Sequence, residues 1–205
     1  MHPIVGVLLS YLAGSVPFAL LAGKARGIDL RQHGSGNLGA TNAVRVLGPR
    51  VGGLVYLGDT LKGLLPVLLL PKVVQTTNPD LWAIAFGIAA VIGHVRPVFL
   101  LGKGGGKGVA TAGGVFFGLA WVPALISLIV FAVTLMITRI VSVSSLAGAV
   151  ALPIALLVWA GPRAPLFLVS VALLLFVVWT HRSNIGRLRR GEEPRFGQKP
   201  GVTAQ

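Results

Sequence analysis

The sequence has no cysteine among its 205 residues, which excludes disulfides, thiolate nucleophiles, zinc–cysteine sites and iron–sulfur clusters. Acidic residues are also scarce, with 5 Asp and Glu against 18 Lys and Arg. The sequence therefore shows no paired-carboxylate site and no carboxylate cage for magnesium, which argues against kinase or ATPase chemistry. We accordingly expect no metal ion and no cofactor.

Charged residues of either sign are few. They make up 11% of the chain, whereas a typical soluble protein has about 25%. Apolar residues make up 54%, and the mean hydropathy is +0.84. These values predict a chain that is solvated mainly by lipid. They argue against a disordered protein and against a soluble nucleic-acid binder, despite the formal net charge of +13.

Seven apolar runs are candidate membrane spans, although some are shorter than the roughly 20 residues that a spanning helix needs. The first run follows Met-His-Pro, which lacks the basic patch of a secretory signal, so we expect a retained helix. The candidate spans are Ile4–Gly23, Gly53–Leu70, Leu81–Val95, Val109–Val122, Ala124–Ile137, Val143–Ala160 and Leu166–Trp179.

The distribution of basic residues decides the number of spans. The uncharged stretch between Lys107 and Arg139 has 31 residues, enough for one tilted helix or two short helices broken at Pro123. With two helices, 15 of the 18 Lys and Arg fall on one side of the membrane, which the positive-inside rule assigns to the cytoplasm. We therefore predict an all-α polytopic membrane protein with seven transmembrane helices, an N-terminus outside and a cytoplasmic C-terminus. We expect one domain over residues 1–195 and a disordered cytoplasmic tail over 196–205.

Three polar segments fall on the predicted cytoplasmic side, and the first is HGSGNLGATNAVR, His33–Arg45. Its glycines let the backbone approach an anion closely, and its uncharged polar side chains supply donors. If a helix begins near Gly39, Thr41 and Arg45 share a face, and Arg45 can add a bidentate contact to a phosphate. The alternative is a glycine-rich interfacial turn with solvating polar groups. The candidate substrate-binding residues are Gly34, Gly36, Asn37, Thr41, Asn42 and Arg45, and Ser35 is a candidate catalytic residue.

The second segment is GKGGGKGVAT, Gly102–Thr111, which leads into the fourth predicted span. Consecutive glycines free backbone N–H groups for an anion, two lysines add positive charge, and the following helix adds its dipole. It is not a Walker A loop, because Leu101 and Gly108 stand where that pattern needs Gly and Ser or Thr. Alternatively, the lysines anchor the membrane surface and the glycines pack helices together. The candidate substrate-binding residues are Lys103, Gly104, Gly105, Gly106, Gly108 and Thr111, and Lys107 is a candidate catalytic residue.

The third segment is THRSNIGRLRRGEEPR, Thr180–Arg195, at the end of the last predicted span. If the helix continues, His181 and Asn184 lie three residues apart on one face. Histidine is the usual general base near neutral pH, so both residues are candidate catalytic residues. A histidine at a helix end is alternatively an interfacial hydrogen-bonding group, and we expect the arginine run to bind lipid headgroups.

Three ionisable residues lie near the ends or the middle of predicted spans. Asp59 and Lys62 are three apart in the second span, where a lone charge costs about 2.5 to 3.5 kcal/mol, so we expect a structural pair or a brace for the site. His94 ends the third span beside the second segment, where it is either structural or lines the pocket. No histidine is followed five positions later by aspartate, and no G-x-S-x-G elbow is present, so two common acyl-transfer and hydrolase signatures are missing.

Together, five stretches resemble one known family. They are GSVPFALLAGKARGIDLRQHGSGNLGATNAVRVLG from Gly14, DTLKG from Asp59, GHVRPVFL from Gly93, KGGGKGVAT from Lys103 and HRSNIGRL from His181. With these motifs the sequence resembles the bacterial membrane glycerol 3-phosphate acyltransferases that use acyl phosphate as donor, the PlsY family. One departure is the third glycine of KGGGKG, where KGGKG is expected. It leaves open which lysine faces the substrate, and Lys107, next to GVAT, is the better match.

The resemblance implies transfer of a fatty acyl group from acyl phosphate to the 1-hydroxyl of glycerol 3-phosphate. The products are lysophosphatidate and phosphate, and the reaction is the first acylation step of phospholipid synthesis. The family also implies seven spans in the bacterial inner membrane, an active site facing the cytoplasm, and no acyl-CoA or carrier-protein donor. A soluble acyl-phosphate synthase is a candidate partner, and we expect a monomer that binds no nucleic acid.

We expect Ser35, Arg45 and neighbouring amides to hold glycerol 3-phosphate, and Lys107 with residues 104–108 to hold acyl phosphate. The general base is either His181, oriented by Asn184, or a phosphate oxygen of the substrate. These roles presuppose that the three segments meet in the folded protein.

Two other functions fit parts of the sequence. A small transporter of anionic solutes would use the same loops as a gated site, but transporters place polar residues deep in several spans. Here only Asp59 and Lys62 lie deep. A lipid-phosphate scaffold without catalysis would explain the arginines but not the polar residues of the three segments.

Overall fold

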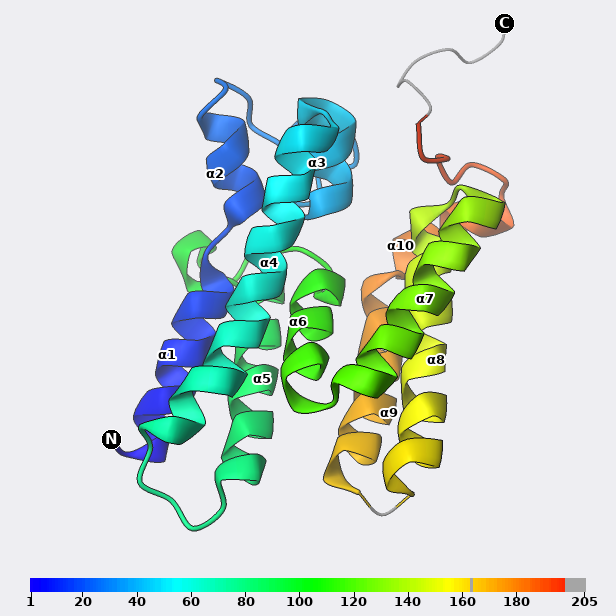
Figure 1. The fold of residues 1–205 in the computed structure, drawn as a ribbon. Coiled ribbons are helices and arrows are strands. Elements are labelled where there is room, and N and C mark those ends of the chain that lie inside the picture. Colours follow the sequence, from blue (N-terminus) through cyan, green and yellow to red (C-terminus); the bar gives the residue numbers. More distant parts are fainter. Residues whose placement is uncertain (163, 198–205) are drawn as a thin grey trace, which may run out of the picture. The chain divides into compact units, whose positions relative to one another are not determined.

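The computed structural model describes residues 1–162 and 164–197, and every regular element in these ranges is a helix (Figure 1). The chain forms two compact units, Met1–Trp121 and Val122–Gln205, called unit 1 and unit 2 below. The expectation of a single domain stays a prediction, and residues 198–205 of the predicted tail lie outside the described residues. The α-helices are α1 (Pro3–Ser15), α2 (Phe18–Lys24), α3 (Ala40–Leu47), α4 (Pro49–Leu69), α5 (Pro79–Val95), α6 (Val109–Leu119), α7 (Trp121–Thr138), α8 (Val141–Ala160), α9 (Pro165–Thr180) and α10 (Arg182–Arg189), and the 3-10 turns are η1 (Leu70–Lys72) and η2 (Val98–Leu100).

Helices lie at all seven predicted positions, but they differ in their capacity to cross a bilayer. Among the described residues, five segments are long and apolar enough, and the bent pair α9–α10 raises the number to six if it forms one span. Helix α6 has 11 residues, which corresponds to about 16 Å and is roughly half the thickness of the hydrocarbon core. The chain is therefore a multi-pass membrane protein, while seven crossings and the orientation of the termini stay predictions. The five segments are Pro3–Lys24, Pro49–Lys72, Pro79–Leu100, Trp121–Thr138 and Val141–Ala160.

The predicted break in the long uncharged stretch is present but lies at a different residue. Helix α6 ends at Leu119, Ala120 has φ −155° and ψ 75°, and α7 starts at Trp121. The prediction of a break at Pro123 was therefore wrong by three residues. Proline in the first turn of a helix is tolerated, because its missing N–H would have no intrahelical acceptor there. Pro123 accordingly belongs to the start of α7 and not to the gap.

The first predicted span, Ile4–Gly23, is interrupted, which corrects the expectation of one continuous helix. Helix α1 ends at Ser15, Val16 is extended with ψ 115°, and α2 begins at Phe18. Pro17 explains the break, since it lacks an N–H donor and disfavours the α conformation of the preceding residue.

Close packing of α1 against α5 positions the second polar segment. A Cβ on Gly14 would overlap the carbonyl of Ala90, and one on Gly93 would overlap the carbonyl of Tyr11. Without side chains at these two glycines, the helix backbones approach each other closely, as in many membrane helix pairs. In addition, the Tyr11 hydroxyl donates to the carbonyl of Arg96 at 2.8 Å. The C-terminal end of α5 is therefore fixed to α1.

Helices α4 and α6 show the same kind of contact. A Cβ on Gly63 would overlap the carbonyl of Thr111, and one on Gly114 would overlap the carbonyl of Thr60. Small residues at both positions hold α6, which begins directly after the second polar segment, against the middle of α4.

An apolar cluster underlies the first polar segment. It joins α2, the loop that follows it, α3 and α4, and Leu100 packs against its edge. Because Leu100 lies two residues before the second polar segment, the first two segments are built on a common core. The buried members are Ala19, Leu20, Leu30, Leu38, Ala43, Leu47 and Val55.

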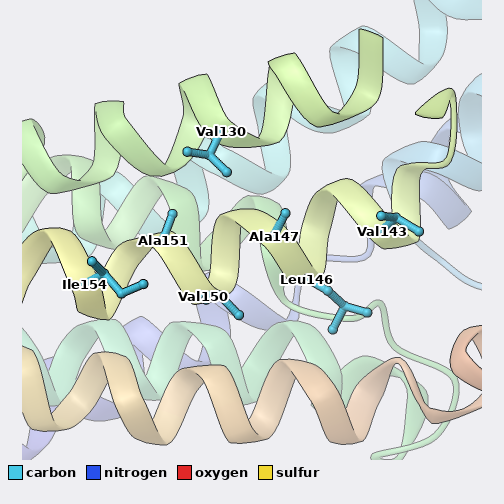
Figure 2. Close-up of a pocket in the computed structure, with 7 residues that line it drawn as sticks. All are labelled: Val130, Val143, Leu146, Ala147, Val150, Ala151 and Ile154. Atoms are coloured by element: carbon cyan, nitrogen blue, oxygen red, sulfur yellow. The ribbon is translucent and has the colours of Figure 1, made fainter. Parts of the chain in front are cut away.

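Unit 2 contains an apolar groove between α7 and α8, with a volume of about 540 Å³. Figure 2 shows Val130 of α7 facing it together with side chains of α8. Lipid acyl chains fit such a groove better than water, because the residues that line it present hydrocarbon side chains. They are Val130, Val143, Leu146, Ala147, Val150, Ala151 and Ile154.

Candidate active site

The first polar segment forms a tight turn that leads into α3, as predicted, with Gly39 as the residue before the helix. The turn is shaped by Asn42, whose side chain is buried at 1% exposure. Its Oδ1 accepts the Ser35 N–H at 2.9 Å, and its Nδ2 donates to the carbonyls of Leu30 and His33 at 3.2 and 3.0 Å. Asn42 therefore holds the turn from within, a role that the sequence analysis missed when it placed this residue among the substrate contacts.

Two glycines of this turn adopt the left-handed conformation, with φ +64° at Gly34 and +69° at Gly36. A Cβ on Gly34 would also overlap Oδ1 of Asn42. Glycine is needed at these positions because other residues reach this conformation only with strain.

The polar side chains around the turn remain accessible. Ser35 and Thr41 are exposed, and Asn37 and Arg45 are half-buried. Thr41 and Arg45 lie one helical turn apart in α3, so the prediction that they share a face is confirmed. This arrangement can bind an anion, with backbone amides at the start of α3 and a guanidinium one turn further.

An ion pair marks the entrance to this segment. The Arg31 guanidinium donates to both carboxylate oxygens of Asp29, at 3.0 Å from Nε to Oδ1 and 2.7 Å from Nη2 to Oδ2. Hydrogen bonds from the side chain and backbone of Arg31 lower the pKa of Asp29 to about 2. Asp29 therefore stays ionised and keeps its ion pair with Arg31.

The second polar segment begins with an irregular loop, Gly102–Gly108, between η2 and α6, and its last three residues form the start of α6. Gly102, Gly104 and Gly108 have φ of +73°, +72° and +86°. The Gly106 N–H donates to the carbonyl of His94 at 3.2 Å, and the loop is followed directly by the first turn of α6. Lys103 is exposed and Lys107 is half-buried. The glycine-rich backbone, the two lysines and the N-terminus of the 11-residue helix α6 fit the predicted phosphate cradle.

Thr111, the last candidate of this segment, is fully buried under α4. Its hydroxyl has no hydrogen-bond partner among the described residues. Its role as a substrate contact stays a prediction.

The predicted pairing of Asp59 and Lys62 is confirmed. Asp59 Oδ1 lies 2.8 Å from Lys62 Nζ, and both side chains are almost completely buried. His94 joins them, with its Nδ1 3.5 Å from the same Asp59 oxygen. His94 is thus buried against Asp59 and directly beside the second polar segment, and its lining of the substrate pocket stays a prediction.

The third polar segment lies in unit 2, and its helix is bent. Helices α9 and α10 meet at an angle of 58°. His181 stands at this junction, so the condition under which His181 and Asn184 would share one helix face, a continuous helix, is not met. His181 is 3% exposed, and its Nδ1 lies 2.8 Å from the carbonyl of Val177. The orientation of His181 by Asn184, and the meeting of this segment with the first two, stay predictions.

Glu193 is the residue of this segment that sequence reasoning missed. The Asn184 amide donates to its Oε1 at 2.6 Å, and Nε of Arg187 donates to its Oε2 at 2.7 Å. Burial raises the pKa of Glu193, but hydrogen bonds from Asn184 and Arg187 outweigh this effect and lower the pKa below its usual value. With five acidic residues in the sequence, a carboxylate inside an arginine run was a signal that could have identified it.

Part of the arginine run is therefore engaged within the protein. Arg187 binds Glu193, and Nε of Arg190 donates to Glu192 at 2.7 Å. The Arg182 guanidinium stacks 4.8 Å from the centre of the Trp179 ring. Binding of lipid headgroups by the run stays a prediction.

Comparisons with known proteins match nearly the whole chain. A family model described as glycerol-3-phosphate acyltransferase covers residues 4–191. A glycerol-3-phosphate acyltransferase of Geotalea daltonii is 47% identical over 193 residues, which are 94% of this chain and 97% of the relative. One of Geobacter metallireducens is 49% identical over 187 residues, covering 91% and 94%.

Two solved structures have the same fold. Both are of PlsY, an integral membrane glycerol 3-phosphate acyltransferase, in its glycerol 3-phosphate form and its lysophosphatidic acid form. The first is 39% identical with a TM-score of 0.87 and covers 95% of this chain and 96% of the other. The second is 38% identical with a TM-score of 0.84 and covers 95% of both chains. The chain is thus a membrane acyltransferase, and it belongs to the glycerol-3-phosphate acyltransferase family, PlsY.

Proposed function

We propose that this protein transfers a fatty acyl group from acyl phosphate to the 1-hydroxyl of glycerol 3-phosphate, giving lysophosphatidate and phosphate. The observation that carries the proposal is the pair of glycine-rich, basic segments built on one apolar core in unit 1. Two phosphate-bearing substrates need two such sites. The solved relatives, whose names give glycerol 3-phosphate and lysophosphatidic acid, agree with the acceptor and the product.

The first segment holds glycerol 3-phosphate in this proposal. Its phosphate lies against the amides at the start of α3, with Arg45 as the charged partner and Ser35, Asn37 and Thr41 as hydroxyl and amide partners. The turn needs no rearrangement for this role, because Asn42 already fixes its backbone. Preorganised sites of this kind lose little entropy on binding.

The second segment holds the phosphate of the donor, and Lys107 with the loop amides stabilises the charge that leaves with it. The acceptor oxygen attacks the carbonyl carbon, a new C–O bond forms, and the bond between that carbon and the bridging phosphate oxygen breaks. Phosphate departs with the electron pair, so no acyl-enzyme is needed. Holding the acceptor oxygen about 3 to 3.5 Å from the carbonyl carbon supplies much of the acceleration, and the donors around the oxyanion supply more.

The proton of the acceptor hydroxyl passes to His181 or to an oxygen of the departing phosphate. His181 as base requires that unit 2 bring it to the other two segments. His181→Ala separates the alternatives, because retention of near-normal turnover at pH 7.5 excludes the imidazole as the base.

We place the enzyme in the bacterial inner membrane with seven spans and with its site on the cytoplasmic side. The excess of Lys and Arg in the loops predicted to be cytoplasmic supports this orientation. A soluble acyl-phosphate synthase would supply the donor from that side, and the chain would act as a monomer.

The first experiment measures phosphate release by the purified protein in lipid nanodiscs. It receives glycerol 3-phosphate with palmitoyl phosphate or, in parallel, with palmitoyl-CoA. Release and lysophosphatidate formation that require both glycerol 3-phosphate and palmitoyl phosphate support the proposal. Product from palmitoyl-CoA alone overturns the assignment of the donor. Absence of product with either donor from folded protein overturns the proposed reaction and makes anion transport the next function to test.

A further inference from the structure

The buried cluster of Asp59, Lys62 and His94 has no assigned part in the proposed reaction. All three residues are buried: the exposed fraction is 1% for Asp59, 7% for Lys62 and 5% for His94. Oδ2 of Asp59 has no hydrogen-bond partner among the described residues. Ionic groups in this setting are weak contributors to stability, because desolvation offsets most of their attraction. Stability alone therefore does not explain why these three ionisable residues are buried together at this place in the fold.

The imidazole of His94 lies between Asp59 and the second polar segment. Its Nδ1 faces Asp59. Its Nε2 faces Gly106 so closely that a Cβ at Gly106 would overlap the ring. The His94 carbonyl accepts the Gly106 N–H at 3.2 Å, and a Cβ at Gly105 would overlap the carbonyls of His94 and Val95. Both the ring and the backbone of His94 thus form the wall on which the glycine loop rests.

A loop with so many glycines needs such a wall. Each glycine loses more conformational freedom on ordering than any other residue, so the loop holds one shape only where neighbouring groups impose it. The hydrogen bond from Gly106 fixes one point, and the imidazole blocks collapse of the loop toward α4. On the other side of the ring, the Asp59 carboxylate lies 3.5 Å from Nδ1 and limits rotation of the imidazole.

Lys62 links the same cluster to the first half of the site. Its Nζ donates to the carbonyl of Val16 at 2.8 Å, at the break between α1 and α2. It also lies 5.6 Å from the centre of the Phe18 ring at the start of α2. Helix α2 leads to the first polar segment. The cluster therefore touches the supports of both segments.

We propose that His94 is a positioning residue for the loop Gly102–Gly108, and that Asp59 and Lys62 hold its ring in place. The loop is set in the conformation that receives a phosphate group. That His94 fixes the loop conformation follows from contacts within unit 1. That this conformation binds the phosphate of the donor rests on the proposed function.

Hydrogen exchange tests the placing of the loop without any substrate. His94→Ala in nanodiscs should speed exchange of the amides of residues 104–107 at least tenfold. Val91→Ala, a buried truncation one turn earlier on α5, is the matched control and should leave the loop unchanged. Equal exchange in His94→Ala and wild type overturns the proposal, and equal acceleration in both variants reduces His94 to an ordinary packing residue.

Two replacements of His94 divide its contacts. A glutamine amide takes the position of Nε2 beside Gly106, and an asparagine amide takes that of Nδ1 beside Asp59. His94→Gln should restore slow loop exchange, whereas His94→Asn should resemble His94→Ala. In the enzyme assay, His94→Ala should raise the KM for palmitoyl phosphate at least tenfold and change kcat less than threefold, with the KM shift largely reversed in His94→Gln. A fall in kcat alone contradicts a positioning role.

The outcomes keep the two proposals apart. If wild type makes lysophosphatidate but His94→Ala leaves both loop exchange and KM unchanged, the positioning of the loop is wrong and the reaction stands. If the loop loosens in His94→Ala but wild type makes no product, the reaction is wrong and the positioning stands.

Discussion

The two glycine-rich segments of unit 1 look alike in sequence but are held in different ways. The first is fixed by Asn42, a neutral amide from the helix that the segment itself begins, with its oxygen and nitrogen both bonded to backbone. The second is fixed by His94 of the preceding helix, backed by a buried ion pair from α4. The first support is local and neutral, and the second depends on tertiary contacts and on charge. We therefore expect the two segments to fail differently when their supports are removed.

The largest effect is expected from Asp59→Asn. It leaves the Lys62 ammonium buried without its charged partner, which costs about 3 to 5 kcal/mol for pairs of this kind. The double variant Asp59→Asn/Lys62→Met removes both charges and should recover most of that loss. Thermal unfolding in detergent measures both. A double variant as unstable as the single one would contradict the view that the pair contributes placement more than stability.

Asn42→Ala should have the next largest effect, and it should fall on the first segment. It removes three hydrogen bonds between side chain and backbone, worth about 2 to 3 kcal/mol together. The KM for glycerol 3-phosphate should rise at least tenfold, while the KM for palmitoyl phosphate stays within twofold. Gln32→Ala, which removes an exposed amide just before the first polar segment, is the control and should match wild type. A rise in both KM values would show that the two segments are not separable.

Gly106→Ala tests the same contact with His94 by changing the loop residue instead of the histidine. The added methyl group overlaps the His94 ring, and overpacking of this kind costs about 1 to 3 kcal/mol. We expect about a tenfold loss in kcat/KM for palmitoyl phosphate, and a loss in His94→Ala/Gly106→Ala that is smaller than the product of the two single losses. Gly113→Ala on α6, where a Cβ meets open space, should be neutral. Strictly additive losses in the double variant would argue against contact between the two residues.

Glu193 is a third kind of support, because it is charged and binds residues close to it in the sequence, Asn184 and Arg187. Its replacement is expected to have the smallest effect. Its folded pKa is lowered, so its contribution is present above the ordinary value of 4.5 and is lost as the pH falls below it. Glu193→Gln should cost about 1 kcal/mol near neutral pH and remove this acid-side loss. Proteolysis of the segment after α10, measured from pH 7 to 3.5, reports the change. Glu192→Gln, which breaks an exposed pair, should behave as wild type.

Hydrophobic runs located the helices well because lipid leaves the backbone few alternatives to helix. The runs did not show where a helix is interrupted, since Pro17 breaks the first span whereas Pro123 lies within the first turn of α7. Both prolines are preceded by apolar residues, and their opposite roles depend on which neighbouring groups donate hydrogen bonds to the exposed carbonyls. That information lies in tertiary contacts such as the one between Lys62 and Val16.

The site was predictable where chemistry depends on local spacing. The face shared by Thr41 and Arg45, and the pairing of Asp59 with Lys62, follow from helical periodicity. The structural use of Asn42 did not follow, because an asparagine that binds backbone and one that binds substrate look the same in a sequence. The contact between His94 and Gly106 joins residues from different elements, so spacing alone could only place them near each other.

The contact between Lys62 and the carbonyl of Val16 also has a consequence for biogenesis. The two residues are 46 positions apart, so Val16 leaves the ribosome well before its partner. Until α4 is inserted, the carbonyl at the kink has the short turn bond from Phe18 and lacks the ammonium. An exposed polar group is costly in hydrocarbon. The break between α1 and α2 should therefore reach its final structure only after α4 has inserted and Lys62 can donate to Val16. In this sense α4 acts as an intramolecular chaperone for the N-terminal span.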